Sequence, residues 1–498
     1  MNKLKWKILG IYEDLSYYIL GLPRFLFVWK DNKKLSLLNF FDNNVKKRPN
    51  DIAFIFEGDE ITWKEADEQT NKYAGFLKSQ NINKGDCFAI LMDNSPDFLM
   101  LLLASFRVGS LAALINTTVS GEGLKHVIGI SDVKLITAGA SHLEKLSSAL
   151  GDSDLKNIPI FGMEDNEKIP DQVEDIKKLS KQFSTFIPYQ PIMKDVAAYI
   201  FTSGTTGLPK AALVDHAKLV KGSFAGHFLC FNFNKNDRLY MTLPLYHSTG
   251  LILGWAASLR SGCPNVIKSK FSASDFWNDV KKYNVNKFIY VGELCRYLMN
   301  LPPSDGDKDN PITQISGNGL RPDIWESFQK RFNISKIVEI YGATEAVGMT
   351  INSFGRSGMI GRKRSDSTII HCNKDDGSPI LNDEGFCTKV SEGETGLYIQ
   401  KISSSAKFQG YLDAQASNKK ILQNVFKTGD QYFNTGDLIT LHDNNWLSFA
   451  DRVGDTYRWK SENVSTMEVA AILNNASGVM DCNVCLLYTS PSPRDRYI

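Results

Sequence analysis

The sequence has few residues that could form disulfides or bind a metal cluster. Its 498 residues include eight cysteines and seven histidines, dispersed without a framework. This usage favours a reducing compartment. The CxxC of Cys482 and Cys485 has no second pair at zinc-site spacing, so we interpret it as chance. The formal net charge of +2 provides no basic field, so we expect no nucleic-acid partner.

Long apolar runs are also lacking. No segment is long enough to span a bilayer, and the sequence has neither a signal-peptide pattern nor an internal repeat. Residues 3–30 nevertheless combine Lys3, Lys5 and Lys7 with many aromatic and aliphatic side chains. Such a mixture is typical of a segment lying on a membrane surface, although a helix packed on the protein's own body fits the same pattern.

The sequence does contain alternating strand and helix patterns, and the chain is too long to form a single hydrophobic core. It predicts an α/β fold with doubly wound parallel sheets. After about residue 385 the pattern changes to short strands and turns, which predicts a small β-rich subdomain. Residues 164–181 are polar and predict a surface excursion. The main expected strands are 53–57, 86–92, 196–201, 395–402 and 446–451, and the expected helices are 63–78, 95–108 and 123–130.

One stretch, residues 199–210 (YIFTSGTTGLPK), starts in the apolar strand expected at 196–201 and changes at Thr202 to hydroxyl and glycine residues. Its hydroxyls and glycines can present N–H and O–H donors to an anion, and Lys210 adds positive charge. The stretch is no Walker A loop, because that pattern needs Gly-Lys-Ser/Thr at the start of a helix. We interpret it as a polyphosphate cradle that follows the carboxyl end of a strand. A flexible surface loop is the alternative.

Four further stretches follow in order: PLYHSTG at 244–250, SGNGLRP at 316–322, YGATEA at 341–346 and NTGDL at 434–438, the last followed by Asp451-Arg452. With TSGTTGLPK, they resemble the motifs of the adenylate-forming superfamily over about residues 36–475. GNGLRPDIW and DTYRWKSENVST resemble in particular the fatty acid transport proteins, also called very long-chain acyl-CoA synthetases. The resemblance implies the adenylate-forming fold, with a C-terminal lid.

The resemblance also implies roles for individual residues. Thr344 would contact the α-phosphate and Glu345 would hold Mg²⁺, which prefers carboxylate oxygen. Asp437 would accept hydrogen bonds from both ribose hydroxyls. The residues implied for the phosphates are Thr202, Ser203, Gly204, Thr205, Thr206, Gly207 and Lys210. Those implied for adenine and ribose are Asn318, Gly319, Leu320, Tyr341, Gly342, Asp437 and Arg452.

Two features concern the acyl substrate. His247 occupies the position at which the family keeps an aromatic gate beside the acyl carboxylate, and a buried structural histidine is the alternative. The apolar run 251–259, with Trp255, could line the acyl tunnel or form ordinary helix core. No Ser-His-Asp or Cys-His arrangement is present, which agrees with a reaction that needs no protein nucleophile.

The end of the sequence departs from the family pattern. We expect a membrane-interfacial segment at 1–35, a large AMP-binding domain at 36–451, a truncated lid at 452–484 and a non-native tail at 485–498. The tail resembles translated vector sequence, with a divergent natural tail as the alternative. No residue matches the family's lid lysine, so we expect impaired catalysis from this chain. Ser461 also replaces a glycine that is usual in the family.

The implied function is ligation of a long- or very long-chain fatty acid to coenzyme A, dependent on ATP and Mg²⁺. Two anions, the carboxylate and the α-phosphate, must meet, so positive charge and oriented donors are needed. The alternatives are a fatty-acid uptake or binding protein and a ligase for bile acid or another bulky carboxylate. The resemblance also implies membrane association, with the active site facing the cytoplasm.

Overall fold

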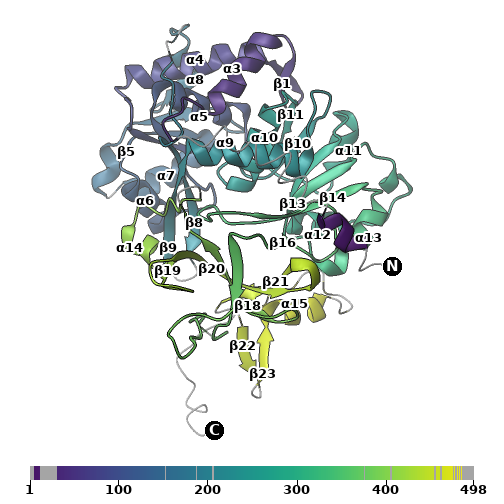
Figure 1. Cartoon of the computed structure of the whole chain (residues 1–498). Coiled ribbons are helices and arrows are strands. Elements are labelled where there is room, and N and C mark those ends of the chain that lie inside the picture. The colour runs from purple at the N-terminus through teal and green to yellow at the C-terminus, as the bar shows by residue number, and fades with distance from the viewer. Residues whose placement is uncertain are drawn as a thin grey trace, which may run out of the picture.

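A computed structural model describes the chain at residues 5–11, 31–151, 153–184, 186, 188–204, 207–374, 376–403, 406–453, 456–459, 462–474, 476, 479, 482 and 484. In these parts, two large sheets stand side by side, and a smaller β-rich sheet lies at one end of the pair (Figure 1). The predicted fold class, mainly parallel sheets plus a β-rich subdomain, is confirmed.

The first large sheet carries the hairpin predicted to bind phosphate. Its strands run parallel from β7 to β8, and only the last pair, β8 with β9, is antiparallel. The strands, in sheet order, are β7 (Glu174–Asp175), β6 (Ile160–Met163), β5 (Val133–Gly139), β3 (Cys87–Leu91), β4 (Leu111–Leu114), β8 (Val196–Gly204) and β9 (Gly207–Asp215). Two residues of the predicted surface excursion, Glu174 and Asp175, therefore belong to the sheet as β7.

The second large sheet is parallel in its middle and antiparallel at both edges. The motifs GNGL and YGATE follow the carboxyl ends of two neighbouring parallel strands, β13 and β14, which places both loops at one edge. The strands, in sheet order, are β15 (Thr350–Asn352), β14 (Lys336–Tyr341), β13 (Gln314–Asn318), β12 (Lys287–Val291), β10 (Leu239–Met241), β11 (Asn265–Ile267), β1 (Ile52–Phe56) and β2 (Asp59–Thr62).

The β-rich sheet is antiparallel and carries the NTGDL motif on its longest strand, β20. Its strands are β16 (Gly361–Arg362), β21 (Trp446–Arg452), β20 (Gln431–Leu441), β18 (Thr395–Lys401) and β17 (Ser367–Ile370), with β19 (Ile421–Gln423) paired to β20. Beyond it, a hairpin of β22 (Thr456–Trp459) and β23 (Glu462–Ser465) precedes α15 (Thr466–Asn474).

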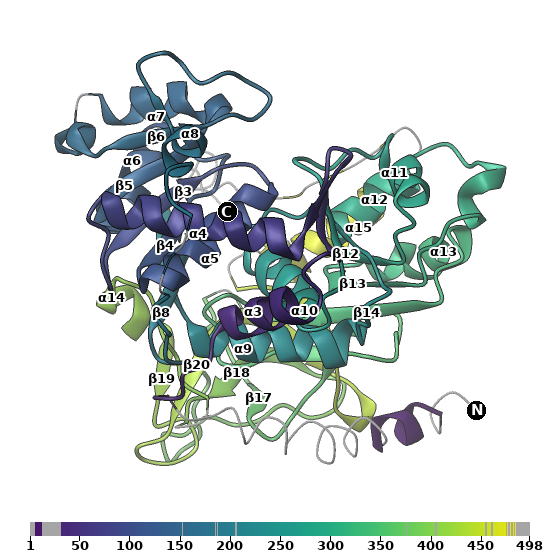
Figure 2. The same cartoon turned by 90° about the horizontal axis from the view of Figure 1, so that it is seen from above.

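Helices cover both large sheets, and α9 and α10 lie between them (Figure 2). Local signals set several boundaries: Thr62 and Glu65 form a capping box at the start of α4, and Gly109 closes α5 in a left-handed conformation. The helices are α3 (Leu37–Lys47), α4 (Trp63–Ser79), α5 (Pro96–Val108), α6 (Gly121–Ile130), α7 (Leu143–Leu150), α8 (Ile176–Ser180), α9 (His216–Ala225), η4 (Gly226–Phe231), η5 (Thr249–Trp255), α10 (Ala256–Leu259), α11 (Phe276–Lys282), α12 (Gly292–Met299), α13 (Pro322–Arg331) and α14 (Ala414–Asn418).

The N-terminal segment is described only at residues 5–11, where it is helical. The Trp6 ring meets Trp446 of β21 edge-on, with the centroids 5.8 Å apart. Arg362 donates a hydrogen bond from Nη1 to the Gly10 carbonyl at 2.8 Å. This turn therefore packs on the β-rich sheet, as the alternative interpretation predicts, while Ile8 and Ile11 remain exposed. In the described residues, no helix is long and apolar enough to cross a membrane.

Candidate functional site

The phosphate-side hairpin, β8 and β9, ends the seven-stranded sheet. Thr202 lies opposite Lys210 across the hairpin, and Gly204 lies opposite Gly207. Thr205 and Thr206 lie outside the described residues, and only the backbone is described for Ser203, Gly204 and Gly207. The pairing of the two strands therefore brings Thr202, the first hydroxyl residue of TSGTTGLPK, and Lys210 to the same end of the hairpin.

A tyrosine joins this hairpin to the YGATE motif. The Tyr411 hydroxyl donates to Glu345 Oε1 at 2.7 Å, and Lys210 Nζ lies 5.7 Å from the centroid of its ring. Burial and the Glu345 carboxylate raise the pKa of Tyr411, whereas a hydrogen bond with Thr202 opposes the rise. Tyr411 was not predicted from the sequence, because no motif marks a contact between segments 66 residues apart.

Tyr341, Asp437 and Arg452 meet where the eight-stranded sheet faces the β-rich sheet. The Tyr341 hydroxyl donates to Asp437 Oδ2 at 2.5 Å, and Arg452 Nε lies 3.4 Å from Asp437 Oδ1. Burial raises the pKa of Asp437, although the Tyr341 hydrogen bond and Arg452 oppose the rise. Three residues from three separate motifs thus form one polar cluster.

The loop predicted to contact adenine, Asn318 to Leu320 (the adenine-side loop), rests on a buried carboxyl group. Glu339 of β14 accepts hydrogen bonds at Oε1 from the backbone N–H groups of Gly319 and Leu320. Its Oε2 accepts from the Tyr290 hydroxyl at 2.5 Å. Burial raises the pKa of Glu339 to about 8, with Tyr290 and the two amides opposing. The Leu320 side chain belongs to the hydrophobic core, so this residue offers mainly its backbone to the loop.

The PLYHSTG loop is held by a buried asparagine. Asn94, just after β3, donates to the Leu243 carbonyl and accepts from the Leu245 N–H, both at 2.8 Å. His247 packs edge-on against Tyr246, with ring centroids 4.7 Å apart, and burial lowers its pKa. His247 is not in the lining of the cavity described next, whereas its neighbours Ser248 and Thr249 are.

A cavity of about 340 Å³ lies between α9, η5 and the β-rich sheet. One side of it, called here the nucleotide side, is lined by Ser248, Asn318 and Thr344 from the predicted motifs. The outer side is lined by the exposed residues Asp31, Lys401 and Lys407. Its volume falls in the range of small-molecule sites. The apolar part of the lining comprises Ala217, Ala225, Leu229, Ile252, Leu253, Ile340, Ala343, Ala346, Val347, Met349, Ile351, Tyr398 and Ala406. Of the run 251–259, only Ile252 and Leu253 line the cavity, and Trp255 is core.

A lysine enters this cavity from the first turn of α9. Lys218 Nζ donates a hydrogen bond to the Thr344 carbonyl, and the Thr344 hydroxyl lies 3.0 Å from Ser248 Oγ. Burial lowers the pKa of Lys218 to about 8, while Asp215 and Glu345 oppose the fall. The ammonium therefore remains mostly protonated at neutral pH. Lys218 was not predicted from the sequence, because it lies outside the motif TSGTTGLPK, which ends at Lys210.

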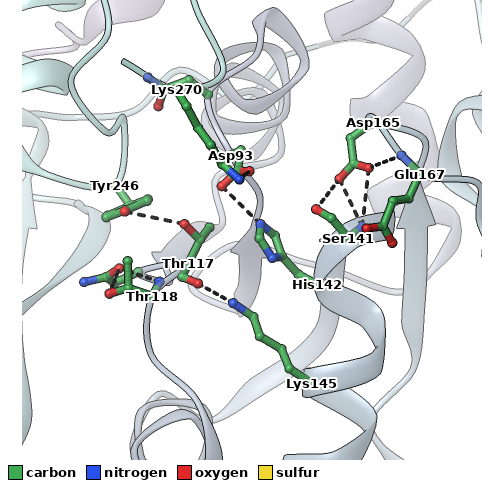
Figure 3. A network of polar contacts seen from close by, with 12 residues as sticks. Asp93, Thr117, Thr118, Ser141, His142, Lys145, Asp165, Glu167, Tyr246 and Lys270 are labelled. Carbon is green, nitrogen blue, oxygen red and sulfur yellow. Dashed lines mark hydrogen bonds and ion pairs between the residues drawn. The ribbon is translucent and has the colours of Figure 1, made fainter. Parts of the chain in front are cut away.

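A second polar cluster lies at the carboxyl ends of β3, β4 and β5 (Figure 3). Asp93 Oδ1 accepts a hydrogen bond from His142 Nε2 at 3.1 Å, and Asp93 Oδ2 lies 3.5 Å from Lys270 Nζ. Thr117 donates to the Tyr246 hydroxyl at 3.5 Å. Burial would raise the pKa of Asp93, but His142 and Lys270 outweigh it and lower the pKa to about 2. The cluster ties the loop that carries His247 to the seven-stranded sheet.

Comparison with known proteins gives one family match and many similar chains. Residues 41–396 match the family model described as AMP-binding enzyme. Long-chain fatty acid transport protein 6 of Mus musculus is 37% identical over 488 residues, covering 95% of this chain and 78% of the relative. The medium/long-chain-fatty-acid–CoA ligase FadD6 of Mycobacterium tuberculosis is 32% identical over 458 residues, covering 91% and 75% of the two chains.

Solved structures share the fold at low identity. The anthranilate CoA ligase AuaEII, in complex with anthranoyl-AMP, superimposes with a TM-score of 0.76 at 18% identity, covering 91% of this chain and 84% of that one. ATP-bound MatB from Rhodopseudomonas palustris gives a TM-score of 0.74 at 20% identity, covering 91% and 86%. At these identities the likeness establishes the fold alone.

Proposed function

The chain belongs to the AMP-binding enzyme family, among the relatives of the fatty acid transport proteins, and we propose that it joins a long-chain fatty acid to coenzyme A through an acyl-adenylate. The observation that carries the proposal is the cavity, whose apolar lining leads to Ser248, Asn318 and Thr344 beside the nucleotide motifs. An acyl chain in this cavity would bring its carboxylate to the same place as the α-phosphate of ATP. FadD6, a relative, is named for this type of reaction.

In the first step, a carboxylate oxygen attacks the α-phosphorus, and the bond to the bridging oxygen breaks, releasing pyrophosphate. Lys210 and the hairpin donors offset the negative charge of the phosphates. Thr344, held by Ser248, is positioned to donate its hydroxyl to an α-phosphate oxygen. Asp437, already fixed by Tyr341 and Arg452, accepts from the ribose hydroxyls.

ATP would enter with Mg²⁺, for which Glu345 would be the protein ligand. One Glu345 oxygen accepts from Tyr411, which orients the carboxylate and leaves its second oxygen for the cation. A single carboxylate suits Mg²⁺, which binds ATP sites largely through phosphates and water. The ion neutralises phosphate charge when bound. Tyr411 is then a positioning residue, because it acts through Glu345.

In the second step, the thiol sulfur of coenzyme A attacks the acyl carbon, its proton leaves to solvent, and AMP departs. The acyl-adenylate is already activated, so no nucleophile from the protein is required. We propose that residues 36–451 form the domain that binds ATP and the acyl chain, and that residues 452–484 begin the lid. We also propose membrane association with the active site facing the cytoplasm, supported by the exposed Ile8 and Ile11 near Lys5 and Lys7.

The test is to incubate the purified chain with oleate, ATP, Mg²⁺ and coenzyme A and to follow AMP and oleoyl-CoA by mass spectrometry. Both products should form together, at the reduced rate expected of this chain, and Asp437→Ala should suppress both. Asp383→Asn, which changes an exposed carboxylate, is the matched control and should behave as wild type. Oleate binding without AMP formation would instead support an uptake or binding protein. A preference for bile acid in the same assay would support the bulky-carboxylate alternative.

A further inference from the structure

Lys218 lines the cavity, and its ammonium group has few hydrogen-bond partners there. Among the described residues, its single hydrogen bond runs from Nζ to the Thr344 carbonyl, and no carboxylate lies within ion-pair distance. An ammonium has three N–H donors, so two remain for another acceptor. The nearby carboxylate of Asp215 is already engaged, because it accepts from the backbone N–H of Lys218 and, at 2.7 Å, from the Gln409 side chain.

The surroundings favour an anion at this ammonium group, although the carboxylates of Asp215 and Glu345 already offset part of the cost of its burial. The cavity lining that includes Lys218 also contains the apolar side chains of Ala217, Ile252 and Ile340, together with charged residues such as Asp215 and Lys221. A charged group in such a wall is destabilising unless a counter-charge and hydrogen bonds compensate it. Lys218 lies on the nucleotide side of the cavity, because it touches Thr344, and Thr344 contacts Ser248 there.

From this geometry we infer that Lys218 binds the carboxylate of the acyl substrate before adenylation. The two remaining N–H donors would meet the carboxylate oxygens while the hydrocarbon chain follows the apolar wall. The same contact would keep the carboxylate next to Thr344, where the α-phosphate is proposed to lie. This inference rests on the proposed function, and it adds a specific residue for recognition of the acid group.

The same helix offers a matched control. Lys221 lies one turn further along α9 and also lines the cavity. Burial lowers the pKa of Lys221 too, with Asp215 and Asp31 opposing the fall. Lys218→Met and Lys221→Met therefore remove the same charge from two neighbouring positions in one cavity.

The experiment measures binding of oleate and of oleyl alcohol by equilibrium dialysis, without nucleotide. Wild type should bind oleate more tightly than oleyl alcohol. Lys218→Met should weaken oleate binding roughly ten- to hundredfold, the range for hydrogen bonds to charged groups. It should leave oleyl alcohol within about twofold, because the apolar contacts are unchanged. Lys218→Arg should retain part of the preference for oleate, and Lys221→Met should retain all of it.

The results separate the inference from the proposed function. Equal losses for oleate and oleyl alcohol in Lys218→Met would show that the lysine only supports Thr344, and would overturn the inference. Unchanged oleate binding in that variant would overturn it as well. If wild type bound neither ligand, the fatty-acid substrate itself would be wrong. Should Lys218→Met fail to fold, equal affinities of wild type for oleate and oleyl alcohol would still refute the inference.

Discussion

The adenine-side loop at 318–320 rests on a buried carboxyl group, whereas the phosphate-side hairpin, β8 and β9, ends at the edge of its sheet. Glu339 accepts hydrogen bonds from two backbone N–H groups and one hydroxyl, so the adenine-side loop is held against the core. The hairpin is supported at its end by Tyr411, whose ring lies near Lys210 and whose hydroxyl forms a hydrogen bond with Thr202. The base side of the site is therefore preorganised by the core, and the phosphate side depends on a contact from the β-rich subdomain.

The largest effect should come from removing the support of the adenine-side loop. Glu339→Ala leaves two amides and the Tyr290 hydroxyl without their acceptor in the core. The free energy of unfolding should fall by about 3 kcal/mol or more, since each unsatisfied buried group costs about 1–3 kcal/mol. Urea denaturation measures it. Glu339→Gln keeps an acceptor oxygen in the same shape and serves as control; equal losses in both variants would contradict this role.

Asp437→Ala should have the next largest effect, and on nucleotide binding. It removes the acceptor proposed for the ribose hydroxyls, together with the partner of Tyr341 and Arg452. Calorimetry at millimolar MgATP should show binding weaker by about 1.5–3 kcal/mol, the scale of hydrogen bonds to charged groups. Asp383→Asn provides the control. Wild-type affinity in Asp437→Ala would remove this residue from the site.

The pH dependence of stability gives a third measurement on the adenine side. The pKa of Glu339 is raised from 4.5 to about 8 in the folded chain, so the folded state holds this proton more tightly than the unfolded state. The stability that it contributes is present below pH 4.5 and is lost as the pH rises through about 8. Between pH 7 and 8 this loss should amount to roughly 1 kcal/mol.

Glu339→Gln cannot titrate and is the comparison for that experiment. Its free energy of unfolding should therefore decline less than that of wild type over the same interval, when both are measured by urea denaturation in matched buffers. Parallel curves for the two proteins would mean that another group governs the pH dependence. Because both proteins share every other titratable side chain, the difference between the curves isolates Glu339.

The smallest effect should come from the phosphate side. Tyr411→Phe removes the hydroxyl that orients Glu345 but keeps the ring beside Lys210. MgATP binding should weaken by about 0.5–1 kcal/mol, the net value of one hydrogen bond. Adenosine binding should not change, because the adenine-side loop is untouched. A loss of adenosine affinity of the same size would show that the two supports are not independent.

Several local features could be predicted from the sequence. The helix expected at 63–78 is α4, and the strand expected at 196–201 begins β8, because periodicity and capping are local properties. The packing of Trp6 on Trp446 could not be decided in this way. An aromatic residue beside basic ones fits either a membrane surface or a protein surface, and only the neighbouring sheet distinguishes them for residues 5–11.

Residue identity and spacing were enough to predict the family, the order of the motifs and the chemical groups that they carry. Which of these groups meet depends on the tertiary structure. Tyr411 donates a hydrogen bond to Glu345, and Glu339 accepts one from the Gly319 N–H. Lys218 lines the cavity and donates to Thr344, whereas His247 is not in the lining. These contacts connect segments far apart in the chain, and their geometry follows from how the sheets pack rather than from any local pattern.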